Sequence, residues 1–158
     1  MRKFEVVSVE QFNKDFPNSL LTRTDIKLPK RATAKSAGYD IYSPIDFVLN
    51  PGEVIKFSTG VKVLMPDNEF LAVVPRSGHG FKHFSRLANT IGIIDADYYG
   101  NVNTDGCIYM KLRNESTDTQ LVVKAGDAIA QGIFLQYLTT DDDDSTAERV
   151  GGLGSTSK

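Results

Sequence analysis

The chain has 158 residues, of which 41% are hydrophobic and 24% are charged. This length predicts one domain that buries about two-thirds of the surface of its unfolded chain. The formal net charge of -2 lacks the basic excess of a general nucleic-acid binder, so no nucleic-acid partner is expected. A local pocket of Arg and Lys for one phosphorylated ligand remains compatible with this charge.

Cysteine usage and the N-terminal residues predict the cellular compartment of the protein. Cys107 is the only cysteine, so no internal disulfide can form. We interpret it as a small residue in a strand rather than a nucleophile, because no basic neighbour favours a thiolate. The first 16 residues show no secretory signal, and no apolar run approaches the roughly 18 residues of a membrane span. We therefore expect a cytoplasmic protein without membrane association.

Short β-like runs separated by Gly, Pro, Asn and Asp dominate the chain. This texture predicts an all-β sandwich or barrel rather than alternating strands and helices. A single short helix is expected, over Gly78 to Leu87. The expected strands are Phe47–Leu49, Val54–Phe57, Val61–Leu64, Phe70–Val74, Ile108–Leu112 and Leu121–Val123, with a longer one after the turn at Gly126-Asp127.

The segment Arg76-Ser77-Gly78 follows the end of an expected strand. A guanidinium binds phosphate bidentately, a hydroxyl donates, and Gly allows close backbone approach, so these residues suit an oligophosphate. Ser77 as an acyl-transfer nucleophile is disfavoured, because the Gly-x-Ser-x-Gly elbow is absent. His79 and His83 are expected to be exposed polar positions, and their spacing lacks the Glu of a zinc-binding helix.

The segment Asn89 to Gly100 reads NTIGIIDADYYG. Its apolar run favours a rigid strand that delivers Asp95 and Asp97 to a Gly-ended turn, as a general base requires. The alternative is a hairpin whose Asp residues satisfy only turn backbone.

The chain changes character after residue 138. Thr139 to Ala147 contains four consecutive Asp residues, which predicts a solvated linker, since like charges repel and gain nothing from burial. A metal site at Asp141 to Asp144 is the weaker alternative. The tail Arg149 to Lys158 lacks the Lys of a Walker A loop. It is interpreted either as plain disorder or as a lid over phosphates.

Five segments, in order, carry a resemblance to a known family. They are SAGYDIYSP (Ser36 to Pro44), VVPRSGHG (Val73 to Gly80), NTIGIIDADYYG, GDAIAQGIF (Gly126 to Phe134) and RVGGLGSTSK. Together they resemble the trimeric dUTPase family, which converts dUTP to dUMP and pyrophosphate. The resemblance implies a jelly-roll-like β-domain over residues 1–138, and an acidic linker with a flexible Gly- and Ser-rich lid over residues 139–158.

The resemblance also implies roles for individual residues. Asp95 would activate the attacking water, and Tyr98 would pack under the deoxyribose and exclude a 2′-hydroxyl. Asn89 would bind the edge of uracil, and Asp40 would help to organise the tail and bound water. The phosphate and lid set would be Arg76, Ser77, Gly78, Gln131, Arg149, Leu153, Gly154, Ser155 and Thr156.

The resemblance further implies that Mg²⁺ is held by the substrate triphosphate and by waters rather than by direct protein ligands. It implies a homotrimer with shared active sites, in which the tail lies over a neighbour's site.

Two departures from the family pattern stand out. Leu153 occupies the place of the usual aromatic residue that stacks on the base, and Asn103 to Cys107 reads as an insertion that alters a subunit contact or a partner surface. A dCTP deaminase shares the fold but requires a Glu where this chain has Asp95. A nucleotide-sensing regulator that contacts a protein partner is the alternative from another class.

Overall fold

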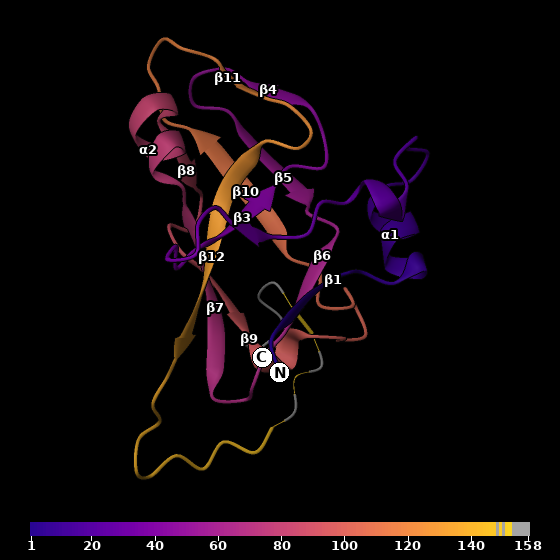
Figure 1. Cartoon of the computed structure of the whole chain (residues 1–158), viewed down its shortest axis with the longest axis vertical. Coiled ribbons are helices and arrows are strands. Elements are labelled where there is room, and N and C mark those ends of the chain that lie inside the picture. Colours follow the sequence, from indigo (N-terminus) through magenta and orange to yellow (C-terminus); the bar gives the residue numbers. More distant parts are fainter. Residues whose placement is uncertain (148, 150, 153–158) are drawn as a thin grey trace.

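The computed structural model describes residues 1–147, 149 and 151–152 (Figure 1). The helices are α1 (Val9–Asp15) and α2 (Ser77–His83), with two 3₁₀ turns at Arg23–Asp25 and Ala96–Tyr98. The strands are β1 (Lys3–Val6), β2 (Lys30–Arg31), β3 (Tyr39–Tyr42), β4 (Phe47–Leu49), β5 (Val54–Ser58), β6 (Val61–Leu64), β7 (Glu69–Pro75), β8 (Ser85–Leu87), β9 (Gly92–Asp95), β10 (Tyr109–Asn114), β11 (Leu121–Val123) and β12 (Ala128–Gln136).

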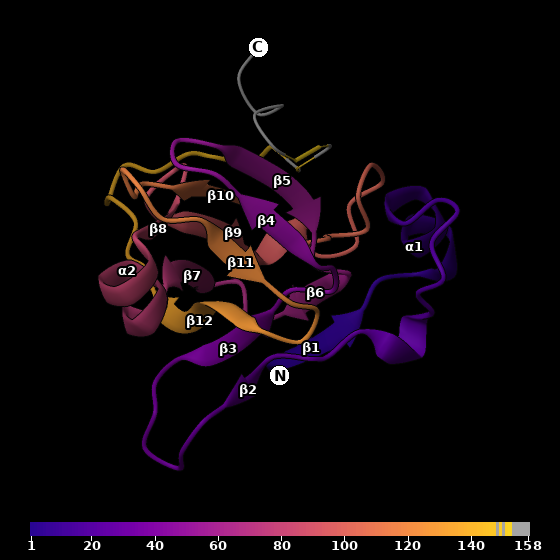
Figure 2. The ribbon, with the colours of Figure 1, turned by 90° about the horizontal axis from the view of Figure 1, so that it is seen from above.

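The strands form antiparallel sheets that enclose one main core (Figures 1 and 2). The largest sheet has the order β2-β3-β12-β7-β9, and a smaller one has the order β5-β10-β8. The β11-β4 and β1-β6 pairs complete the described sheets. The main core draws Leu71 from the largest sheet, Met110 and Leu112 from the smaller one, and Leu121 from the β11-β4 pair. The all-β prediction is confirmed.

A second, smaller apolar cluster attaches α1 to the β-core. Phe12 of α1 is 5% exposed and packs in this cluster with Val61 of β6 and with Cys107. Ser8 caps the helix, because its Oγ accepts a hydrogen bond from the backbone N–H of Gln11 at 3.2 Å. α1 was not predicted from the sequence, because seven residues are too few to show a 3.6-residue period.

The helix expected over Gly78 to Leu87 differs from the one observed. α2 begins at Ser77 and ends at His83, and Ser85–Leu87 forms β8 instead. Phe84 ends the helix in the left-handed region, with φ of 50°. A Phe at positive φ is rare, so the sequence carries no ordinary stop signal at this position.

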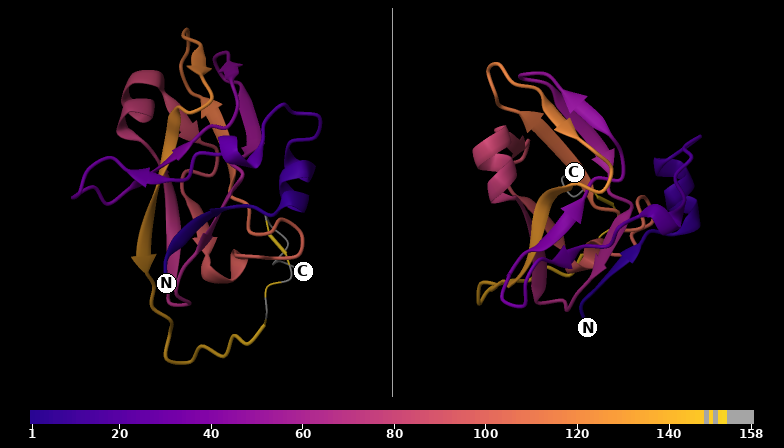
Figure 3. Two further views of the ribbon diagram at one scale, coloured as in Figure 1. Left: turned by 45° about the vertical axis from the view of Figure 1, so that its right-hand side comes forward. Right: turned by 45° about the horizontal axis from the view of Figure 1, so that its top comes forward.

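The segment after β12 runs as a long loop away from the sheets (Figures 1 and 3). Every residue from Thr139 to Ala147 is exposed, as expected for a solvated linker. Within the part of the chain that the structure describes, no helix has the length and apolarity needed to cross a bilayer.

Asn114 at the end of β10 connects three chain segments through buried hydrogen bonds. It is 0% exposed. Its Nδ2 donates to the carbonyl of Leu49 at 2.9 Å and to that of Thr119 at 2.8 Å, and its Oδ1 accepts from the backbone N–H of Ser116 at 3.0 Å. One amide side chain therefore holds the β4, β10 and β11 connections together.

Replacing Asn114 should destabilise the fold strongly. Asn114→Ala leaves three backbone groups without partners, so we expect the free energy of unfolding to fall by at least about 2 kcal/mol. Urea denaturation measures this loss. Asn13→Ala, at an exposed position of α1, is the control and should change stability by no more than about 0.5 kcal/mol. Equal losses in the two variants would contradict the assigned role of Asn114.

Candidate active site

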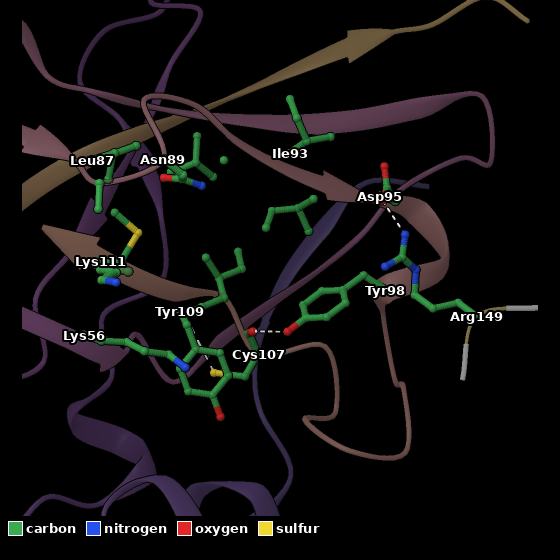
Figure 4. A pocket seen from close by; sticks show the side chains of 16 residues that line it. Lys56, Leu87, Asn89, Ile93, Asp95, Tyr98, Cys107, Tyr109, Lys111 and Arg149 are labelled. Atoms are coloured by element: carbon green, nitrogen blue, oxygen red, sulfur yellow. Dashed lines mark hydrogen bonds and ion pairs between the residues drawn. The ribbon is translucent and has the colours of Figure 1, made fainter. Parts of the chain in front are cut away.

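A cavity of about 550 Å³ opens beside β9 and β10 (Figure 4). Asn89, Asp95 and Tyr98 line it, as do Tyr109 and Arg149. Asn89 precedes β9, Asp95 ends it, and Tyr98 closes the following 3₁₀ turn. β9 and the turns on either side of it thus bring together three residues with roles implied by the family resemblance. Those roles are binding uracil for Asn89, activating water for Asp95 and packing under the deoxyribose for Tyr98.

Tyr98 forms a fixed wall of this cavity. It is 6% exposed, and its hydroxyl donates to the carbonyl of Cys107 at 2.9 Å. Burial raises the pKa of Tyr98, so the phenol stays neutral. Gly152 lies against the ring, where an added Cβ would approach Tyr98 Cε2 to 2.4 Å. Only glycine fits at this point of the tail.

Arg149 pairs with the two carboxylates of the β9 turn. Its guanidinium contacts Asp95 directly, and its Nε lies 2.7 Å from Asp97 Oδ1. The Arg149 side chain is 16% exposed, whereas that of Asp95 is 48% exposed. The prediction grouped Arg149 with the site, and the structure places it against the expected catalytic carboxylate.

This contact lies within one chain. Arg149 and Asp95 belong to the same chain, and the tail lying over a neighbour's site stays a prediction. Leu153, Gly154, Ser155 and Thr156 of the lid set fall outside the described residues.

Two lysines of the cavity were not predicted from the sequence. Lys56 of β5 and Lys111 of β10 both line it and stand directly opposite each other in the sheet register. Like charges in this position are unfavourable by themselves, and a bound anion would offset the repulsion. Only the strand register reveals this pair, since 55 positions separate the two residues in the chain.

Cys107 is part of the cavity wall and is inert. It is 0% exposed and lies just before β10 rather than in a strand, which corrects that detail of the prediction. Burial raises the pKa of its thiol to about 12. At neutral pH the group is therefore a thiol and a poor nucleophile.

A second cluster gathers the other predicted phosphate ligands. Asp40 of β3 stands opposite Gln131 of β12, and Asp40 Oδ1 lies 2.9 Å from Arg76 Nε. Gln131 Nε2 donates to the carbonyl of Pro75 at 3.3 Å. A Cβ on Gly38 would lie 2.1 Å from Gln131 Oε1, so this glycine makes room for the Gln131 side chain.

Ser77 and Gly78 open α2 beside this cluster and are exposed. The adjacent His79 differs from the prediction of an exposed position, because it is only partly exposed. Burial lowers the pKa of His79, and the neighbouring His83 and Arg76 lower it further. His79 is therefore neutral at physiological pH. His83 is exposed, as predicted.

The cavity around Asp95 and the second cluster around Arg76 lie at opposite ends of β7. Asp95 pairs with Phe70 near the start of the strand, whereas Arg76 follows its last residue, Pro75. Phe70 and Arg76 are six positions apart along extended chain, which corresponds to roughly 20 Å. Within one chain, Asp95 and the cluster of Arg76 and Gln131 are therefore too far apart to contact the same phosphate group, whereas Arg149 lies beside Asp95.

Comparisons with known proteins identify the family of this chain. The dUTPase family model matches residues 24–157. A deoxyuridine 5′-triphosphate nucleotidohydrolase of Lactococcus lactis is 40% identical over 133 residues, covering 83% of this chain and 88% of that protein. The protein of the same name from Mus musculus is 36% identical over 137 residues, covering 82% of this chain and 78% of that protein.

A solved structure gives the same result. The crystal structure of dUTPase from Streptococcus mutans matches with a TM-score of 0.71 and 33% sequence identity, covering 87% of this chain and 98% of that one. The chain belongs to the dUTPase family. The family and enzyme class predicted from the five segments are confirmed.

Proposed function

We propose that this protein is a dUTP diphosphatase that hydrolyses dUTP to dUMP and pyrophosphate, and so keeps uracil out of DNA and supplies dUMP for dTMP synthesis. The observation that carries the proposal is the cavity of Asn89, Asp95 and Tyr98, to which Arg149 brings a cation for phosphate. The relatives named deoxyuridine 5′-triphosphate nucleotidohydrolase support the same substrate.

In the proposed reaction, Asp95 accepts a hydrogen bond from water and orients it for in-line attack on the α-phosphorus. Pyrophosphate is the leaving group. A carboxylate is a weak base, so orientation of the water matters more than proton removal. The larger contribution comes from cations that stabilise the charge developing on the phosphates.

The Arg149 contacts suggest how the carboxylate becomes available. Arg149 contacts both Asp95 and Asp97. A triphosphate offers the guanidinium a denser anion with bidentate oxygens. We propose that Arg149 transfers to the phosphates when dUTP enters and releases Asp95 to bind water. Leu153, Gly154, Ser155 and Thr156 would close over the substrate as the rest of the lid.

Magnesium would arrive with the substrate. In the described ranges, no three His, Cys, Asp or Glu side chains gather into a potential metal cage. Mg²⁺ commonly takes only one or two protein carboxylates together with substrate phosphates. The residues present fit this mode, with the triphosphate and waters as the main ligands. When bound, the ion would neutralise phosphate charge.

The separation of the two clusters supports a shared site. A nucleotide whose base lies in the cavity of one copy would be bound by the second cluster of another copy. That cluster consists of Asp40, Arg76, Ser77, Gly78 and Gln131. A homotrimer with three such sites, one at each pair of neighbours, satisfies this requirement by closed symmetry.

The Asp95 assignment is tested by one isosteric change. Asp95→Asn keeps the shape but removes the anionic acceptor, so pyrophosphate release from dUTP should fall by roughly two to four powers of ten. Binding of a non-hydrolysable dUTP analogue, measured by calorimetry, should stay within about tenfold. Asp97→Asn removes the other partner of Arg149 and is the control, with a smaller loss. Near wild-type turnover in Asp95→Asn would refute the assignment.

Shared sites are tested by mixing two inactive variants. Asp95→Asn and Arg76→Ala should each lose most activity, but refolding them together should restore it. In random trimers about a quarter of the sites would combine an intact Asp95 with an intact Arg76. Native mass measurement of the same samples reports the assembly. No recovery from a confirmed mixed trimer would show that each site lies within one chain.

The tail is tested by deleting everything after Thr140. Residues Thr139 to Ala147 are exposed, so the melting temperature should change little. Loss of Arg149 should lower turnover by at least roughly tenfold, with a smaller effect on dUTP affinity, because its phosphate contacts would strengthen as charge develops in the transition state. Full-length Asp142→Asn/Asp143→Asn alters only linker charge and should behave as wild type. A fully active truncated protein would leave the tail without a catalytic role.

A further inference from the structure

The loop that follows the β9 turn folds back against Tyr98. Asn101 to Cys107 forms a run of turns between the 3₁₀ turn at Ala96–Tyr98 and β10. The Tyr98 hydroxyl donates to the carbonyl of Cys107 at 2.9 Å and lies 3.0 Å from the hydroxyl of Thr104. Both the donor and the acceptor capacity of the phenol are therefore satisfied by this one loop.

The internal hydrogen bonds of the loop direct the Thr104 proton toward Tyr98. Asn101 is 8% exposed, and its Nδ2 donates to Thr104 Oγ1 at 2.8 Å and to the carbonyl of Tyr98 at 2.8 Å. Asn101 Oδ1 already accepts from the backbone N–H groups of Asn103 and Thr104, both at 3.1 Å. Although Asn101 Oδ1 is also within 3.1 Å of Thr104 Oγ1, its occupied lone pairs leave the Tyr98 oxygen as the better acceptor.

Close backbone packing holds the loop in this position. Gly106 has φ of +79°, and a Cβ there would lie 2.8 Å from the carbonyl oxygen of Tyr98 and 2.9 Å from the backbone nitrogen of Gly100. A side chain at residue 106 would therefore push the loop away from the Tyr98 backbone.

The N-terminal segment also holds the loop from outside. The Asp105 carboxylate accepts from the backbone N–H of Ser8 at 2.6 Å and from Lys62 Nζ at 2.9 Å. Lys14 Nζ donates to the carbonyl of Asn103 at 2.9 Å. Ser8 and Lys14 lie before residue 24, where the match to the family model begins.

We propose that this loop is a positioning device for sugar discrimination, with Thr104 as its central residue. The inference rests on the proposed function, in which the Tyr98 ring excludes a ribose 2′-hydroxyl by its position. A ring held only by apolar contacts can shift, and a displacement of about 1 Å is enough to change fit at a reacting site. The Thr104 hydroxyl and the Cys107 carbonyl fix the far end of the ring and so keep the gap beside C2′ closed.

The test compares selectivity rather than activity alone. Thr104→Val keeps the side-chain shape but removes the hydroxyl. We expect the kcat/KM for UTP relative to dUTP to rise by roughly three- to tenfold, the equivalent of one net hydrogen bond. The kcat/KM for dUTP itself should stay within about threefold. Thr104→Ser retains the hydroxyl and should keep the wild-type ratio.

Two further variants separate positioning from loop stability. Tyr98→Phe keeps the ring and removes the phenol, so it should raise the ratio as Thr104→Val does, and the double variant should add little. Asp105→Asn weakens the attachment to Ser8 and Lys62 without touching Tyr98. It should lower the melting temperature but leave the ratio unchanged.

Binding of dUMP and UMP, measured by calorimetry, gives a second readout that does not depend on turnover. The ratio of their dissociation constants should move in the same direction as the kinetic ratio. An unchanged ratio in Thr104→Val, or an equal shift in Asp105→Asn, would overturn the inference. Absence of dUTP hydrolysis by the wild-type protein, measured first, would instead refute the proposed function.

Discussion

The antiparallel pairing of β7 is the constraint on which the rest of the site depends. β9 lies on one side of this strand and β12 on the other. Phe70 faces Asp95 near one end, and Val74 faces Gln131 near the other. A one-residue slip would move every side chain of β9 to the opposite face of the sheet. The register therefore fixes both the orientation of Asp95 and its distance from the proposed phosphate ligands Arg76 and Gln131.

Much of the fold follows from local chemistry that a single sequence displays. β4, β6 and β11 have the bounds predicted for them, because turn residues such as Asn50-Pro51-Gly52 interrupt the apolar runs sharply. α1 escaped prediction because its stability comes from packing Phe12 against the core and not from a visible period. The end of α2 was not predicted for a different reason, because Phe84 adopts a backbone conformation that its residue type disfavours.

The sequence predicts candidate site residues one by one but not their arrangement. Linear segments point to Asp95 and Arg76 as candidates, yet nothing in their spacing reveals that they lie at opposite ends of β7. The lysine pair could not be predicted from the sequence for the same reason. Lys56 and Lys111 are ordinary exposed strand positions, and only the strand register places them opposite each other. The segment Asn103 to Cys107 was predicted to be an insertion from the family resemblance, but its contact with Tyr98 depends on hydrogen bonds that only the folded chain displays.

The ion pairs of Arg149 with Asp95 and Asp97 bear on the proposed reaction. Pairs between partly exposed side chains contribute little net stability, because water screens the charges and ordering the side chains costs entropy. Asp95 is nearly half exposed, so breaking its contact with Arg149 costs little. In the proposed reaction, a triphosphate offers Arg149 more negative charge than two carboxylates do, and Asp95 would bind a water in exchange. The low cost of breaking the pair is therefore what would allow one arginine to contact Asp95 and then bind the phosphates.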